Sequence, residues 1–289
     1  MLLSTKGLAQ DPQFSQFYAN YLYLGSSFAG LNEENRLAFN YRDQWPGISN
    51  GYETFSVSFD RFFHSFNSGI GAYLIQDVSG TGRLKYSYAG LVYSYDFRIT
   101  ESLHVRPGLS FSYLHAMLDF YRLTWGDQIM AEGTAPISGE ISTYESMNDI
   151  DFGTSLLTYT ENFWLGASVD HLLRPNQSLK KFEEDKDNLG LVPIKYQLYG
   201  GTKYLMKQSL LSPIPSSLQL AFLYKQQQKF TQLDAGLYGY KSPLVLGFWY
   251  RGIPLIKSDY NNDALVILVG YKVPHFSIGY SYDFYHFRA

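Results

Sequence analysis

The stretch Phe163–Val169, FWLGASV, decides the fold class of this chain. Its apolar side chains stand at every second position, at Phe163, Leu165, Ala167 and Val169. A period of two places alternate side chains on opposite faces of a β-strand, whereas a helix needs a period near 3.6. Residues 152–158 alternate in the same way, and only the short connection 160–162 separates the two stretches. Together they predict two neighbouring antiparallel strands.

Working outward from this pair, the same pattern recurs along most of the chain. Aromatic and β-branched runs alternate with turn residues, and no stretch has helical spacing over several turns. We predict strands near residues 36–45, 54–63, 69–77, 84–97, 103–119, 150–159, 163–171, 195–204, 218–226, 230–240, 244–251, 264–273 and 276–284. Single-chain bacterial barrels close with an even number of strands. We therefore expect an all-β transmembrane antiparallel barrel of about 14 strands, with the last strand missing from this chain.

The composition agrees with a membrane barrel. Of the 289 residues 18% are aromatic and only 17% are charged, and the mean hydropathy is −0.19. No apolar run reaches the roughly 18 residues that a helical span requires. In a barrel alternate residues face lipid and a polar lumen, so the mean hydropathy stays near neutral. The net charge of −3, with interspersed signs, gives no reason to expect a nucleic-acid partner, and the absence of cysteine excludes disulfides and thiolate chemistry.

The lengths of the connections predict an orientation. If the first strand runs outward, the long connections 120–149 and 172–194 share the outer end of the barrel. The connections at the other end are short, at 64–68, 98–102, 160–162, 241–243 and 274–275, with 205–217 as a longer exception. Long outer loops and short periplasmic turns are the usual asymmetry of outer-membrane barrels.

The first 35 residues lack this alternation. Ala9-Gln10 is typical of the small-residue end of a secretory signal, but residues 1–8 lack the apolar core of about 7–15 residues that such a signal needs. We therefore expect a signal-peptide remnant at 1–9 with the true start upstream, an N-terminal motif segment at 10–35, and the barrel at 36–289. We expect segment 10–30 to sit in the lumen or to dock to a periplasmic partner.

A series of motifs follows the predicted cleavage site. It consists of Gln10–Gln16 (QDPQFSQ), then 41–46 (YRDQWP), 126–128 (GDQ), 162–166 (NFWLG), 174–177 (RPNQ), 243–251 (PLVLGFWYR) and 279–283 (GYSYD). In this order they resemble the PorP/SprF family, outer-membrane proteins of the type IX secretion system. The motif residues that we regard as candidates for interaction are Gln10, Asp11, Pro12, Gln13, Phe14, Ser15, Gln16, Arg42, Trp45, Asp127, Gln128 and Asn176.

The resemblance implies a role without enzymatic activity. Family members take part in export to the cell surface, and some serve large surface adhesins, including those used in gliding motility. The expected partners are the outer-membrane bilayer, secreted surface cargo and other type IX secretion components, with no cofactor and no metal. A porin or solute transporter remains an alternative. An outer-membrane enzyme is disfavoured, because no Ser-His-Asp constellation has a recognisable spacing.

Several charged residues allow two interpretations. Arg42 could contact a cargo tail from the barrel mouth or could pair with a nearby carboxylate, and Trp45 fits an interfacial aromatic belt. The charged run 180–188 could bind a cation, but its spacing favours a solvated loop. His171 has no nucleophile motif beside it, which favours a structural role. Aspartates near strand ends, at 119, 149, 151 and 170, are expected to face the lumen or water.

Overall fold

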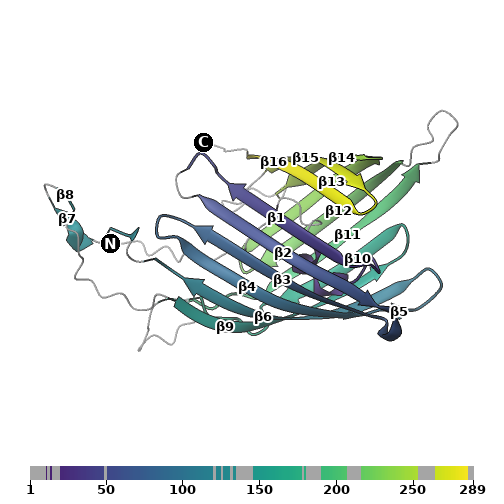
Figure 1. The fold of residues 1–289 in the computed structure, drawn as a ribbon, viewed down its shortest axis with the longest axis horizontal. Coiled ribbons are helices and arrows are strands. Elements are labelled where there is room, and N and C mark those ends of the chain that lie inside the picture. Colours follow the sequence, from purple (N-terminus) through teal and green to yellow (C-terminus); the bar gives the residue numbers. More distant parts are fainter. Residues whose placement is uncertain are drawn as a thin grey trace.

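Most of the described residues form one long, curled antiparallel sheet. The computed structural model describes residues 11, 14, 20–48, 51–119, 122–124, 126–130, 133–134, 146–177, 179, 190–206, 216–252 and 264–285. Most of these residues belong to long tilted strands arranged around a lumen (Figure 1). Within the described part of the chain, no helix has the length and apolarity needed to cross a bilayer.

Each long strand pairs with the next one along the chain. The order is β1 (Arg36–Gln44), β2 (Tyr52–Phe63), β3 (Ser68–Ser79), β4 (Leu84–Tyr95), β6 (His104–Met117), β9 (Ser146–Tyr159), β10 (Phe163–Asp170), β11 (Lys195–Met206), β12 (Ser216–Gln227), β13 (Phe230–Lys241), β14 (Leu244–Arg251), β15 (Ala264–Val273) and β16 (Phe276–Tyr285). The short strand β5 (Phe97–Arg98) follows β4 and also pairs with β6, which gives a 14-stranded sheet.

The smaller elements lie outside this sheet. They are α1 (Tyr21–Leu24), the 3-10 turns η2 (Ser26–Phe28), η3 (His64–Phe66) and η5 (Gly126–Gln128), and the two-stranded pair β7 (Ile129–Met130) and β8 (Gly133–Thr134). Figure 1 shows β7 and β8 beyond one end of the barrel.

The predicted antiparallel barrel and its strands are confirmed. The stretch that decides the fold is β10, and Leu165 of β10 pairs with Thr158 of β9 in register. Among the described residues the sheet is not closed, because β1 and β16 share no backbone pairing. An ion pair of 3.3 Å between Arg42 Nη2 and Asp283 Oδ2 links these two edge strands.

The alternation in the sequence separates two surfaces. On β1 the outward side chains Leu37, Phe39 and Tyr41 are 59–65% exposed. On β2 four successive inward positions hold small or acidic buried side chains, and the next holds the buried Phe62: Thr54, Ser56, Ser58, Asp60 and Phe62. These two strands therefore present an apolar surface outside and a largely polar surface inside, the alternation expected of strands that span a bilayer.

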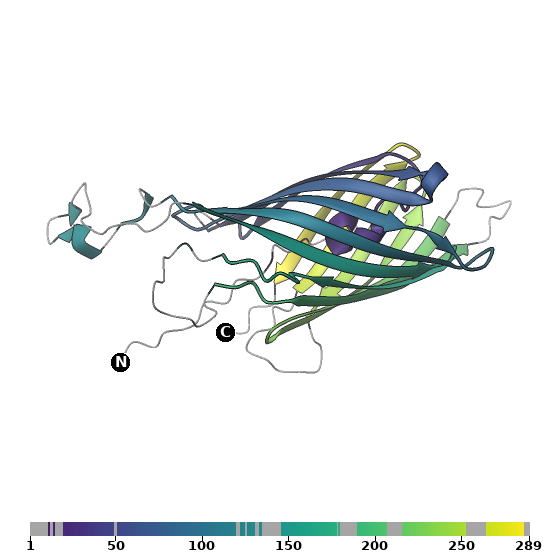
Figure 2. The same ribbon diagram turned by 90° about the horizontal axis from the view of Figure 1, so that it is seen from below.

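Residues 20–31 of the chain lie inside the barrel, against its wall. Figure 2 shows α1 and η2, drawn in purple, inside the barrel. Leu24 and Phe28 pack there against inward side chains of the wall: Leu157, Tyr199, Leu223, Tyr238, Trp249, Val266 and Leu268. The hydrophobic core of the molecule is thus a contact between this segment and the wall.

The two ends of the barrel differ. We call the end that carries the connections 45–51, 80–83, 118–145, 171–194, 228–229 and 252–263 the long-loop end. We call the end with the connections 64–67, 99–103, 160–162, 207–215, 242–243 and 274–275 the short-turn end. The grouping agrees with the predicted asymmetry, including the longer exception between β11 and β12.

Candidate luminal site

The described N-terminal residues contact the lumen at both ends. Asp11 meets residues at the long-loop end, beside the start of β11. Gly30 meets Asp60 of β2, near the short-turn end. We call Asp11 and Phe14 the latch, and Asn20–Leu31 the anchor.

Two wall glycines admit the backbone of the anchor. A β-carbon on Gly69 would collide with the carbonyl oxygen of Ala29, and one on Gly108 would collide with the amide nitrogen of Ser27. Gly30 itself has a φ of +66°, a left-handed conformation that favours glycine. Main chain packs on main chain here, so the fit depends on the absence of side chains.

Hydrogen bonds to the wall fix the anchor further. The Gly30 amide donates to Asp60 Oδ2 at 2.7 Å, and Arg36 Nε donates to Asp60 Oδ1 at 2.8 Å. The Ser27 amide donates to Ser155 Oγ at 2.7 Å. The hydrogen bonds of the Gly30 and Ser27 amides are buried, and a buried donor left without a partner carries the full desolvation penalty.

Arg106 of β6 is the largest fully buried side chain of the wall. Its Nη2 donates to the Ala29 carbonyl at 2.5 Å and to Ser94 Oγ at 2.8 Å. The guanidinium also lies 5.3 Å from the ring centroid of Phe62. A buried cation needs such partners, and here one of them is the backbone of the anchor.

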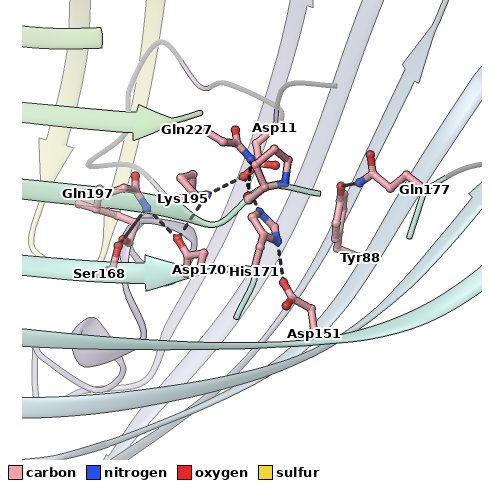
Figure 3. A network of polar contacts seen from close by, with 12 residues as sticks. Asp11, Tyr88, Asp151, Ser168, Asp170, His171, Gln177, Lys195, Gln197 and Gln227 are labelled. Atoms are coloured by element: carbon pink, nitrogen blue, oxygen red, sulfur yellow. Dashed lines mark hydrogen bonds and ion pairs between the residues drawn. The ribbon is translucent and has the colours of Figure 1, made fainter. Parts of the chain in front are cut away.

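The latch is held by an ion-pair cluster (Figure 3). Asp11 Oδ2 accepts from His171 Nε2 at 2.8 Å and from Lys195 Nζ at 2.7 Å. His171 Nδ1 lies 2.6 Å from Asp151 Oδ2, and Lys195 Nζ lies 3.3 Å from Asp170 Oδ2. Since both ring nitrogens of His171 face carboxylates, both donate and the ring is an imidazolium.

The charges of this cluster reinforce one another. Burial alone would lower the pKa of His171, but the Asp11 carboxylate beside it outweighs burial and raises that pKa to about 10. Burial alone would raise the pKa of Asp11, but His171 and Lys195 outweigh it and hold that pKa well below its usual range. Asp11 is therefore a carboxylate bound by two cations.

Phe14 makes the second contact of the latch. Its ring packs edge-to-face on Tyr23 of α1, with centroids 5.7 Å apart and planes at 79°. Lys195 Nζ lies 4.8 Å from the centroid of the same Tyr23 ring. Tyr23 thus forms the floor of the latch site and joins it to the anchor.

A cavity of about 40 Å³ is lined in part by the cluster itself, through Asp11, Asp170, His171 and Lys195. Its lining includes Tyr73, Tyr88, Ser112 and Asp151. The buried Asp151 Oδ1 has no hydrogen-bond partner among the described residues, and the cavity is large enough for ordered water. Within the described part of the chain, no group of three or more His, Asp or Glu side chains is arranged to hold a metal ion.

A second set of ion pairs lies on the neighbouring wall. Asp283 Oδ2 is 3.3 Å from Arg42 Nη2 and 3.0 Å from Arg251 Nη1, and Arg251 also lies 3.7 Å from Asp234. Of the two interpretations of Arg42, the structure contains the pairing with a carboxylate. This set links β1, β13, β14 and β16.

The structure brings few of the predicted interaction residues together. Asp11 and Phe14 share the latch site, while Arg42 belongs to the second set. Trp45 packs edge-on against Tyr52, with centroids 5.5 Å apart. Outside the described residues lie Gln10, Pro12, Gln13, Ser15 and Gln16.

The remaining candidates lie in connections at the long-loop end. Asp127 and Gln128 form part of η5. The Asn176 amide donates to Asp149 Oδ2 at 2.7 Å, and Asn176 forms an isolated bridge with Leu191.

Sequence reasoning missed the wall side of the site. No sequence motif marks Lys195, Arg106 or the pairing of His171 with Asp151. The available signal was a charged residue at an inward strand position, where burial demands a partner. The structural role predicted for His171 agrees with its two carboxylate contacts, and Asp151 and Asp170 line the lumen as expected.

Comparison with known proteins identifies the family. No curated protein matches the chain. Among solved structures, BamA from Haemophilus ducreyi lacking POTRA domains 1–3 matches with a TM-score of 0.41 and 9% identity, over 88% of this chain and 62% of that one. The model of the family "Type IX secretion system membrane protein PorP/SprF" matches residues 7–286, and the chain therefore belongs to the PorP/SprF family of type IX secretion system membrane proteins.

Proposed function

We propose that this outer-membrane protein is an accessory, non-enzymatic barrel of the type IX secretion system that helps the secretion or surface attachment of cargo such as large adhesins. Membership of the family supports the link to secretion. The observation that carries the proposal is the occupied lumen, where the anchor packs against the wall on glycines, buried hydrogen bonds and apolar contacts. A lumen built around a peptide suits protein handling better than solute flow.

Cargo would meet the barrel at the long-loop end, which we propose faces the outside. The candidate residues Trp45, Asp127, Gln128 and Asn176 all lie in connections at this end. The connection 171–194 begins at His171 and ends just before Lys195, the two cations that bind Asp11. A partner bound to this connection would therefore act directly on the latch.

The test is cargo display in the native host. Cells that lack the gene are complemented with the wild type or with a D127A/Q128A/N176A variant, and surface proteins are quantified by labelling of intact cells and mass spectrometry. We expect display of at least one large secreted protein to fall severalfold in the deletion and in the variant. A K272Q variant, at the exposed short-turn end, serves as the matched control. Normal display in the deletion strain would contradict the proposal.

The alternative is a porin or solute transporter. The small polar side chains of the inner wall, such as Ser56 and Ser58, would suit a channel if the lumen were free. In planar bilayers we expect the wild-type barrel to show no stable open level, because the anchor fills the lumen. A defined conductance with cargo display unaffected by deletion would favour the channel.

A further inference from the structure

The latch contacts the lumen through two side chains that insert between side chains of the wall and the anchor. The carboxylate of Asp11 enters between His171 and Lys195, and the ring of Phe14 rests on Tyr23. The receiving groups come from the wall and from the anchor. The latch is therefore related to its site as a short peptide ligand is to a receptor.

The site stays electrically satisfied without this ligand. If Asp11 leaves, His171 keeps its contact of 2.6 Å with Asp151 and Lys195 keeps its contact of 3.3 Å with Asp170. Removing one partner of a buried ion pair is usually costly, because the other charge is left alone. Each cation here has a second carboxylate, so release of Asp11 avoids that penalty.

The anchor behaves in the opposite way. If Ala29 left the lumen, Arg106 Nη2 would lose the backbone carbonyl and keep the Ser94 hydroxyl, while Nε and Nη1 already lack a hydrogen-bond partner among the described residues. Arg106 is fully buried, so its charge would remain with too few partners. The anchor is thus tied to a buried charge that depends on it, whereas the cations that bind Asp11 each have a second carboxylate.

We infer that the latch site is an exchangeable peptide-binding site, occupied in cis by Asp11 and Phe14, that accepts from a secreted partner a segment in which a carboxylate precedes an aromatic residue by three positions. The carboxylate of that segment replaces Asp11 between the imidazolium and the ammonium, and its ring replaces Phe14 on Tyr23. The inference rests on the proposed function only for the source of the segment.

Peptide binding to the purified full-length barrel tests the site. The probe is a fluorescent synthetic peptide with the sequence of residues 10–20, QDPQFSQFYAN, and the readout is fluorescence anisotropy in detergent. A D11N/F14A variant keeps the N-terminal segment but replaces the two side chains of the latch. We expect this variant to bind the probe saturably, and at least about tenfold more tightly than the wild type, whose cis latch competes.

Matched changes then isolate the chemistry. A probe with asparagine in place of its aspartate should bind the D11N/F14A variant at least about tenfold more weakly, since it loses two charge-assisted hydrogen bonds. Adding K195Q to the barrel should have a similar effect. Adding K203Q should have none, because Lys203 lies eight positions further along β11, toward the short-turn end.

The outcomes are separable. Equal binding of the two probes would overturn the inference, and so would absence of binding by a D11N/F14A barrel that shows the heat-modifiable electrophoretic mobility of a folded barrel. The probe comparison leaves the wall unchanged, so a folding defect in K195Q does not affect it. Peptide binding without any loss of cargo display in the deletion strain would preserve the site and contradict the proposed function.

Discussion

The anchor and the latch lie in the same lumen but are held by different kinds of interaction. The anchor lays its main chain on Gly69 and Gly108 and is fixed by buried hydrogen bonds and apolar packing. The latch is held by the ion pairs of one carboxylate and by one ring contact. The backbone of the anchor fits closely against the wall glycines, so another segment could not easily take its place. A carboxylate bound by two cations, in contrast, is replaceable by another carboxylate. One short segment thus contains a structural part and an exchangeable part.

The largest effect should come from the two glycines. We expect Gly69→Val and Gly108→Val each to lower the free energy of unfolding by about 3 kcal/mol or more, because the added side chain would collide with the backbone of the anchor. Thermal unfolding in detergent, followed by heat-modifiable mobility, measures the loss. Gly239→Ala on β13 is the control, since a β-carbon there meets no atom within 4 Å. Equal stability of the glycine variants and the control would show that the backbone of the anchor does not pack closely against Gly69 and Gly108.

Arg106 should give the next largest effect. Arg106→Met keeps much of the side-chain volume but removes both donors to Ala29 and Ser94. We expect a loss of about 2 kcal/mol, because the buried Ala29 carbonyl loses its strongest donor. The same unfolding assay applies, with Arg98→Met as a matched control at an exposed position. An unchanged midpoint would mean that the guanidinium does not stabilise the anchor.

The contrast between the two parts also separates what the sequence reveals from what it hides. The strands were predictable because alternation of apolar side chains is visible within a few residues. The stretch Phe163–Val169 therefore predicts β10 without information about the strands that pair with it. The bounds also agree closely where the alternation is clean, as in β14 and β15. The short helical turn α1 was not predicted, because four residues carry no periodic signal.

The luminal site was hidden because its partners are far apart in the sequence. Asp11 lies 160 residues from His171 and 184 from Lys195, and nothing in either neighbourhood encodes the other. The motif drew attention to Asp11 and Phe14, and the strand pattern placed Asp151 and Asp170 inside. The closed cluster itself follows from the barrel, which brings the ends of β10 and β11 and the N-terminal segment to one point.

A smaller effect, confined to the latch, should follow from Asp11→Asn. We expect the stability of the barrel to fall by well under the roughly 3–5 kcal/mol that an uncompensated buried charge costs, since each wall cation retains a carboxylate. The released fraction of the latch should rise about tenfold. The chain has no cysteine, so a dye attached through Gln13→Cys reports release as a fall in anisotropy. Asp43→Asn, an exposed site on β1, is the control. A large loss of barrel stability would show that the latch is structural like the anchor.

The smallest effect is a dependence of latch docking on pH. His171 has its pKa raised from 6.5 to about 10, so its contribution is complete below pH 6.5 and is lost as the pH rises through 10. Asp11 has its pKa lowered from 3.8, so its contribution is complete above pH 3.8 and is lost on acidification. Lys195, Asp151 and Asp170 complete the charges that face these two groups.

Docking should therefore be strongest between about pH 4 and 6.5, and weaken gradually on the alkaline side. The anisotropy of a pH-insensitive dye at Gln13→Cys follows this directly. His171→Gln should remove most of the change between pH 6.5 and 10, because a neutral amide has no proton to lose there. His64→Gln, at an exposed short-turn position, should leave the profile unchanged. If His171→Gln also left it unchanged, the imidazolium would not be what binds Asp11, and the latch would be held by Lys195 and the Phe14 contact.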